Sequence, residues 1–296
     1  MTLIAALIGA IIISFSAVFF TLSEVSPVTG AFYRMAYALP VLMILWWARR
    51  GEDHRLGSRR WIAFGAGLVV GIDVIAWHTS IEFIGAGLAT LLANSSVVFV
   101  AIAAWILLGE KPSRQVLITI PFVLVGIGMV SGIGQQSAYG EDPLLGTALA
   151  LLAAITYAFF LLGFRHSNDI RAPAAGPLME ATAGALLMTL VFGLLGPGIE
   201  FGFSLPSHGW LLALGLGSQV VGWLLIGFAL PRLAAVETAT IILIQPALTL
   251  VWGALIFSER PSGLQILGAL VVLAGVAFVA IARARTNPEA VTTRTT

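Results

Sequence analysis

The sequence predicts an all-α integral membrane protein whose ten transmembrane helices form two inverted repeats of five helices. Three observations support this prediction. Of the 296 residues, 59% are hydrophobic and only 10% are charged, whereas soluble domains carry roughly 25% charged residues. The basic residues gather in alternate connections between apolar segments. The second half of the chain also matches the first half at a shift of 149 residues.

Composition excludes several classes of protein before any segment is considered. The chain contains no cysteine, which excludes disulfides, thiol catalysis and cysteine-ligated metals. The scarcity of charge excludes a disordered chain and a nucleic-acid-binding protein. No nucleotide-binding loop and no cluster of metal-ligating residues is present in the sequence. We therefore expect no cofactor, no metal and no enzymatic activity.

Ten apolar segments are each long enough to cross the membrane, since about 20 helical residues span roughly 30 Å of hydrocarbon. Helix-breaking prolines and glycines, such as Pro27, Gly51 and Pro261, occupy the short connections between them. The predicted spans are residues 3–22, 28–48, 61–81, 84–108, 115–133, 144–164, 174–195, 208–230, 234–257 and 263–282.

The distribution of basic residues predicts the orientation of the chain. With ten spans, 13 of the 15 Lys and Arg residues fall on the side that holds both termini, and the opposite side holds Arg260. Arg34 lies within a span. Because basic residues accumulate in cytoplasmic loops, we expect both termini in the cytoplasm. The polar tail at 283–296 is predicted to be disordered.

The internal repeat is clearest in the last three helices of each half. Glu-Lys-Pro-Ser at 110–113 aligns with Glu-Arg-Pro-Ser at 259–262, and Ala86 aligns with Ala235. The first repeat covers residues 1–140 and the second covers 141–282. An odd number of helices per repeat inverts the second copy, and such inverted repeats are typical of alternating-access transporters with a site at the membrane midplane.

Several motifs of this repeat resemble a known family. They are Gly-Ala-Gly-Leu-Ala at 85–89, the Gly-Glu-Lys-Pro turn at 109–112 and the Leu-Val-Gly that follows at 124–126. The chain is similar over nearly its whole length to the EamA-type transporters of the drug/metabolite transporter superfamily, and most similar to the bacterial aromatic-amino-acid exporters. The resemblance implies a secondary exporter of aromatic amino acids and some toxic organic compounds in the bacterial cytoplasmic (inner) membrane.

One departure from this family concerns the fourth and ninth spans. The family often has a proline early in the fourth span, where this chain has Asn94, Ser95 and Ser96, whereas the equivalent Pro246 is present in the ninth span. Asn94, Ser96 and Gln245 are candidates for substrate binding. The alternative is a hydrogen bond that holds two helices together, as is common in membranes; the two roles are equally open for Asn94, and the cavity is favoured for Gln245.

Charged or ionisable side chains within predicted spans each need a partner, water or a function, and Arg34, Asp73, His78 and Glu180 are the candidates among them. Asp73 is a candidate for binding a substrate ammonium group or a proton, although an ion pair with Arg34 is the favoured alternative. His78 is a candidate for proton transfer or substrate contact, or else a hydrogen-bonded packing residue. Glu180 is a candidate for gating or coupling, but snorkelling or pairing with Arg165 or Arg171 is favoured.

Aromatic side chains within the spans are the remaining candidates for substrate binding. Tyr37, Trp77, Tyr157 and Trp223 would offer ring faces to an aromatic or cationic substrate. The expected partners are therefore a small-molecule substrate and the lipid bilayer. The sequence leaves the oligomeric state open and is compatible with a monomer.

Three alternative functions were weighed. A sugar-phosphate or nucleotide-sugar exchanger would need several basic groups in the membrane, and Arg34 alone is available. An intramembrane enzyme would need a catalytic signature that the sequence lacks. A scaffold or sensor without transport activity is disfavoured by the repeat but stays open.

Overall fold

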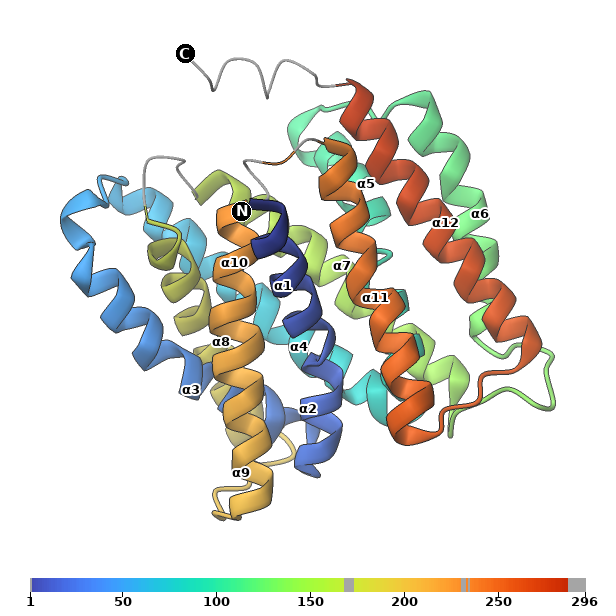
Figure 1. The fold of residues 1–296 in the computed structure, drawn as a ribbon, viewed down its shortest axis with the longest axis horizontal. Coiled ribbons are helices and arrows are strands. Elements are labelled where there is room, and N and C mark those ends of the chain that lie inside the picture. The colour runs from blue at the N-terminus through green and yellow to red at the C-terminus, as the bar shows by residue number, and fades with distance from the viewer. Residues whose placement is uncertain (1, 168–172, 230–232, 234, 287–296) are drawn as a thin grey trace.

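The computed structural model describes residues 2–167, 173–229, 233 and 235–286, without the side chains at 108, 235–240, 242 and 280–286. Every regular element in these ranges is a helix (Figure 1). The elements, in chain order, are α1 (Thr2–Ser14), α2 (Ser16–Ser23), α3 (Pro27–Ala48), the 3-10 turn η1 (Arg50–Glu52), α4 (Gly57–Ala93), α5 (Ser96–Leu108), α6 (Arg114–Val130), α7 (Pro143–Ser167), α8 (Ala175–Leu195), α9 (Leu205–Leu212), the π-helix η2 (Ala213–Gly222), α10 (Trp223–Ala229), α11 (Ala235–Phe257) and α12 (Gly263–Thr286).

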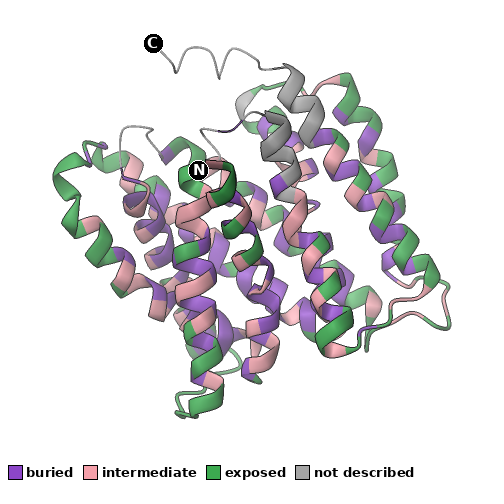
Figure 2. Cartoon of the chain, viewed as in Figure 1, coloured by how far each residue is buried: buried purple, intermediate pink, exposed green. Residues whose placement is uncertain are grey.

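The lengths and composition of these helices are those of a membrane protein. Six helical stretches in the described chain are long and apolar enough to cross a bilayer, and four further helices contain apolar stretches of 10–17 described residues. Exposed residues lie along the outer faces of the helices (Figure 2). Many of them are large and apolar, and Leu195 and Ile106 are 85% and 73% exposed. Such a surface would be a liability in water but is suited to lipid. Ten crossings and their inverted relationship stay predictions.

The fourth predicted span, 84–108, is not one continuous helix, since α4 ends at Ala93 and α5 begins at Ser96. The predicted boundary before this span lies close to a kink in α4 at Gly85, where the backbone is non-helical and φ is +80°. Glycine adopts this conformation at little cost. The helix then breaks before α5, where the side-chain amide of Asn94 donates to the carbonyl of Thr90 at 2.8 Å. A side chain that competes for a backbone carbonyl in this way disfavours a continuous helix.

Two other predicted spans are irregular. The first is divided at Phe15 into α1 and α2, where the hydroxyl of Ser14 donates to the carbonyl of Ile11. The eighth contains the π-helix η2 between α9 and α10, and π-helical turns are frequent at functional sites. At the C-terminus, α12 extends to Thr286, beyond the predicted end at 282, and residues 287–296 of the predicted tail lie outside the described residues.

Close packing of α4 against α8 depends on glycine. A Cβ atom on Gly67 would lie 2.1 Å from the carbonyl oxygen of Ala181, and one on Gly184 would lie 2.1 Å from that of Phe64. These contacts bring the two backbones together, as small residues do in membrane proteins. Because Asp73 and Trp77 lie on α4, this packing positions them against the second half of the chain.

Candidate functional site

A cavity of about 260 Å³ lies between helices from both halves of the chain. Pockets that take drug-sized ligands measure roughly 300–1,000 Å³, so this cavity suits a single small metabolite. Its polar lining consists of Ser16, Arg34, Asp73, Thr90, Asn94, Ser96, Tyr157, Thr182, Gln219 and Gln245, and its aromatic lining adds Trp77, Phe160 and Trp223.

Most of the residues predicted from the sequence meet in this cavity. Eight of the candidates line it, namely Arg34, Asp73, Trp77, Asn94, Ser96, Tyr157, Trp223 and Gln245. Sequence reasoning missed Gln219 and Thr182. Gln219 could have been predicted, because a glutamine within an apolar span is as costly as Asn94, which was predicted on that ground.

Arg34 does not form the ion pair with Asp73 that the sequence suggested. Its Nε atom instead donates to Oε1 of Gln219 at 2.9 Å, and Nε2 of Gln219 donates to Oγ1 of Thr182 at 3.4 Å. The guanidinium carbon lies 5.8 Å from the ring centroid of Trp77. Gln219 belongs to the π-helix η2, 185 residues away in sequence, so this partner could not be deduced from spacing.

The side chain of Asp73 accepts no hydrogen bond or ion pair from the described residues, and neither Nη atom of Arg34 has such a partner. Both residues are nevertheless buried, with 8% and 6% exposure. Asp73 and Trp77 are four residues apart and share one face of α4. The cavity therefore contains a carboxylate and a guanidinium, and the carboxylate oxygens of Asp73 and the two Nη groups of Arg34 are free to meet a ligand.

A second group of polar contacts, at Trp77, Thr90 and Asn94, lies near the C-terminal end of α4. Nε1 of Trp77 donates to Oγ1 of Thr90 at 3.3 Å, and the amide of Asn94 donates to the carbonyl of the same threonine. The side-chain amide of Asn94 therefore donates to the backbone, and Asn94 also lines the cavity. Its two proposed roles, in the lining and in structure, coexist in the same side chain.

Three aromatic rings form one wall of the cavity. Tyr157 lies 5.6 Å from Phe160 and 6.4 Å from Trp223 between ring centroids, and Phe160 lies 6.0 Å from Trp223. Aromatic pairs at these separations prefer tilted and edge-to-face arrangements, and all three pairs have them. This aromatic wall (Tyr157, Phe160 and Trp223) can pack against an apolar or aromatic group of a ligand.

The sequence profile of the EamA-like transporter family matches residues 1–132 and 144–281, which is most of the chain. The chain belongs to this family. Both matched regions contribute residues to the cavity. The cavity is thus a feature of a membrane transporter.

Individual relatives agree with this membership. An uncharacterized transporter of Archaeoglobus fulgidus is 22% identical, with 86% of this chain and 88% of the relative covered. A threonine/homoserine exporter of Salmonella typhimurium is 26% identical, with 70% of this chain and 67% of the relative covered. A solved crystal structure aligns with a TM-score of 0.61 at 17% identity, over 97% of this chain and 99% of that one, and shows a shared fold.

Two predicted site residues of this EamA-like transporter lie away from the cavity. The hydroxyl of Tyr37 is 2.5 Å from Nδ1 of His208, which follows the connection between α8 and α9. His78 is fully buried and stacks on Phe20 with 3.9 Å between ring centroids, while its Nδ1 lies 3.2 Å from the carbonyl oxygen of Pro27. Nε2 of His78 is buried without a hydrogen-bond partner among the described residues, and whether this histidine acts in transport stays a prediction.

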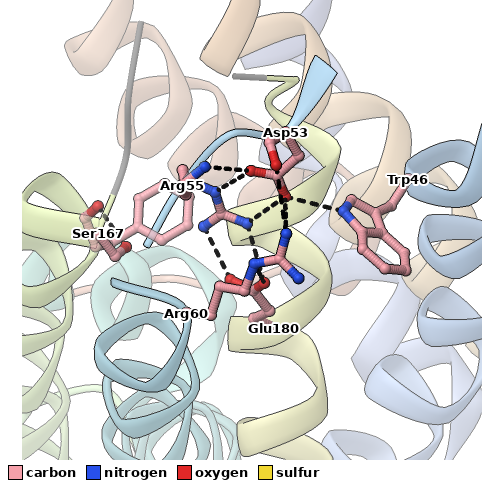
Figure 3. Close-up of polar contacts among 7 residues, drawn as sticks. Trp46, Asp53, Arg55, Arg60, Ser167 and Glu180 are labelled. Atoms are coloured by element: carbon pink, nitrogen blue, oxygen red, sulfur yellow. Dashed lines mark hydrogen bonds and ion pairs between the residues drawn. The ribbon is translucent and has the colours of Figure 1, made fainter. Parts of the chain in front are cut away.

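Glu180 also does not line the cavity. It lies near the N-terminal end of α8, in a buried cluster of charged side chains (Figure 3). Nη1 and Nη2 of Arg55 donate to its two carboxylate oxygens at 2.9 and 3.0 Å. The expected partners were different: Nη1 of Arg165 lies 3.9 Å from a carboxylate oxygen of Glu110, and Arg171 lies outside the described residues. In the sequence, Arg55 was considered only as one of the basic residues that predict the orientation of the chain.

Asp53 completes this cluster in the connection before α4. Its carboxylate accepts hydrogen bonds from Nε and Nη2 of Arg55 at 2.9 and 3.0 Å and from Nε1 of Trp46 at 3.0 Å. Burial by itself raises the pKa of Asp53, but the hydrogen bonds from Arg55 and Trp46 outweigh it and lower the pKa to about 2. Asp53 therefore stays ionised at physiological pH, and the cluster links the α3–α4 connection to α8.

Proposed function

We propose that this EamA-like transporter is a secondary exporter of small amphipathic metabolites, in particular aromatic amino acids, that works by alternating access around the central cavity. The observation that carries the proposal is the cavity itself, which combines an aromatic wall with unpaired polar groups. Its volume suits one small metabolite, and a relative is named as an exporter of threonine and homoserine. The aromatic wall is the reason for preferring aromatic side chains.

The proposed transport cycle uses ten crossings, two inverted repeats at 1–140 and 141–282, and cytoplasmic termini. Several contacts support this arrangement. The connections near Glu24, Gly85, Gly140 and Glu259 surround a common pocket, as expected if all four lie on the external side. The predicted repeat counterparts α6 and α12 pack closely, since a Cβ atom on Gly126 would lie 2.9 Å from the carbonyl oxygen of Gly268.

A phosphorylated substrate fits the cavity poorly. Among the described residues that line it, Arg34 is the only basic one, and Asp73 faces the same space. A phosphate group carries up to two negative charges and is usually held by several cationic groups. An organic phosphate would therefore meet a net charge near zero, which favours a neutral or zwitterionic substrate instead.

Counterflow in proteoliposomes tests the proposed function. Purified protein is reconstituted with unlabelled tryptophan inside, and the entry of labelled tryptophan is compared with that into protein-free liposomes. We expect rapid entry that unlabelled phenylalanine inhibits and glucose 6-phosphate does not. Entry no faster than into protein-free liposomes, together with counterflow of the sugar phosphate, would contradict the proposal. Repeating the assay with an imposed proton gradient identifies proton coupling.

A further inference from the structure

Two opposite charges in the cavity have free hydrogen-bonding groups although both are more than nine-tenths buried. Asp73 and Arg34 are 8% and 6% exposed, and no ion pair joins them. A buried charge is costly unless a partner compensates for it. Two such groups, of opposite sign and in one cavity, are an arrangement that a ligand with both charges would complete.

The contacts of Arg34 orient its free donors. Gln219 engages Nε, and Thr182 in turn holds Gln219. The guanidinium therefore keeps its two Nη groups for a ligand, and this fork matches the two oxygens of a carboxylate. Asp73 offers acceptors only when ionised, which suits an ammonium group.

We infer that the cavity binds the zwitterionic head of a free α-amino acid, with its carboxylate on Arg34 and its ammonium on Asp73. The side chain then lies against the aromatic wall of Tyr157, Phe160 and Trp223. This inference rests on the proposed function and narrows it, because amines and carboxylic acids that lack one of the two charged groups are excluded as good substrates.

Binding of three matched ligands tests the inference. The affinities of phenylalanine, phenethylamine and 3-phenylpropionate for the purified protein are measured by calorimetry in lipid nanodiscs. We expect phenylalanine to bind at least about tenfold more tightly than either analogue, because each analogue leaves one buried charge unpaired. Arg34→Gln should bind phenethylamine as well as phenylalanine, and Asp73→Asn should do the same for 3-phenylpropionate.

Controls separate this inference from the proposed function and from misfolding. Lys111→Gln and Glu24→Gln remove a base and an acid that do not line the cavity, and should leave all three affinities unchanged. Size-exclusion profiles verify that each variant is folded. Equal binding of phenethylamine and phenylalanine by the wild-type protein would overturn the zwitterion site while leaving transport intact. Absence of any aromatic counterflow would instead overturn the proposed function.

A second and independent observation concerns the turn between α11 and α12. The carboxylate of Glu259 accepts hydrogen bonds from the backbone nitrogens of Ala86 at 2.6 Å and Gly87 at 3.0 Å. These are the first residues of α4 beyond Gly85, where the helix restarts. Glu259 thus caps an interrupted helix of the first half from a turn in the second half.

Three glycines make room for this carboxylate. A Cβ atom on Gly85, Gly87 or Gly253 would lie 2.7, 3.0 or 2.3 Å from the nearest carboxyl atom of Glu259. A family motif noted in the sequence, Gly-Ala-Gly-Leu-Ala at 85–89, thereby gains a physical reason. The side chain is 7% exposed, so the turn is closed over the start of this helix.

The repeat counterpart of Glu259 is in a different environment. Glu110 aligns with Glu259, and Ala235 at the start of α11 aligns with Ala86. The Glu110 side chain is 53% exposed and its carboxylate lies 3.9 Å from Nη1 of Arg165. Glu259 therefore caps the start of a helix, whereas its repeat counterpart Glu110 is largely exposed.

We propose that Glu259 is the latch of the external gate, and that it leaves its seat on Ala86 and Gly87 when this face of the transporter opens. The cytoplasmic face lacks the glycines of an equivalent seat, because Ala234 and Val236 replace Gly85 and Gly87 at the repeat positions.

Accessibility of a single cysteine tests the latch, since the chain has no cysteine of its own. Ala93 lines the cavity, and Ala93→Cys is labelled with a membrane-impermeant thiol reagent in right-side-out and inside-out vesicles. Adding Glu259→Ala should raise the external labelling rate about tenfold, the effect of losing one charge-assisted hydrogen bond. Gly253→Ala, which displaces the carboxylate sterically, should do the same, and Glu110→Ala, which removes the exposed repeat counterpart, should leave the external rate unchanged.

The control is Glu82→Ala, which removes an exposed acid of the same external pocket. It should leave both labelling rates unchanged. Unchanged external labelling in both Glu259→Ala and Gly253→Ala would overturn the latch. An equal increase in Glu82→Ala would overturn it too, because the effect would then follow from the loss of negative charge at this face.

Discussion

The two Nη nitrogens of Arg55 donate hydrogen bonds to the two carboxylate oxygens of Glu180, at 2.9 and 3.0 Å. The pair joins the connection before α4 to α8. Neither residue would be linked to the other by sequence, since 125 positions separate them. The pair does not line the cavity, so we predict that it contributes to the stability of the fold and not to substrate binding.

Arg55→Ala should therefore destabilise the protein strongly without abolishing substrate binding by the folded fraction. Removing one partner of a buried ion pair costs about 3–5 kcal/mol, because the other charge stays buried and unpaired. Thermal unfolding in detergent measures the loss. The control is Arg49→Ala, whose ion pair with Glu52 is exposed, and which should shift the unfolding temperature little. Equal shifts in both variants would contradict the assigned role of the cluster.

Stability should also depend on acid pH through Asp53. Its pKa is lowered from 3.8 to about 2 in the folded protein, so its ionised form stabilises the fold at neutral pH, and this contribution is lost as the pH falls from about 4 towards 2. The difference in unfolding temperature between the wild-type protein and Asp53→Asn should be constant above about pH 5 and shrink below pH 4. A difference that does not change with pH would show that Asp53 is not preferentially ionised in the fold.

Neighbouring residues on α4 should respond in opposite ways to substitution. Trp77 lines the cavity, whereas His78 stacks on Phe20 outside it. His78→Gln should lower the unfolding temperature but keep the affinity for phenylalanine within about twofold, and Trp77→Leu should weaken that affinity more than unfolding stability. Calorimetry and thermal unfolding on the same samples check both. A large loss of affinity in His78→Gln would mean that the histidine acts on the site.

The aromatic wall should determine side-chain preference. An aromatic pair is worth about 0.5–1.5 kcal/mol beyond the area that it buries, so Trp223→Leu should weaken phenylalanine binding by about two- to tenfold. Binding of threonine should hardly change, because its side chain cannot stack on the wall. Tyr37→Phe is the control, since Tyr37 contacts His208 outside the cavity. Equal losses for phenylalanine and threonine would contradict a role for this wall in specificity.

The sequence predicted well the features that depend on a single segment of the chain. Apolar runs predict helices, and the cost of polar groups in hydrocarbon singled out Asp73, Asn94 and Gln245, which the structure brings to one cavity. Contacts between distant segments could not be predicted in this way. The partner of Arg34 proved to be Gln219 and not Asp73, because a π-helix in the eighth span turns that amide towards α3.

The predicted boundary between residues 81 and 84 lies close to the interruption of α4 at Gly85, but the residue that stabilises this interruption could not be predicted. A glycine in an apolar run is compatible with both a helix and a break, and its role is decided by Glu259, which lies 174 positions further along the chain. Arg55 and Arg60 were read only as positive charges on the cytoplasmic side, although Arg55 is almost fully buried. Charge counts predict topology, but they do not distinguish solvated residues from buried ones.

The central claim is that the cavity is the substrate site, and protection of a cysteine placed in it tests this claim most directly. In the otherwise cysteine-free protein, the labelling rate of Ala93→Cys is measured with and without saturating tryptophan, and Gly51→Cys in an open connection serves as the control. Tryptophan should slow the labelling of Ala93→Cys several-fold and leave Gly51→Cys unchanged. An unchanged rate at Ala93→Cys, in protein that carries out tryptophan counterflow, would contradict the claim.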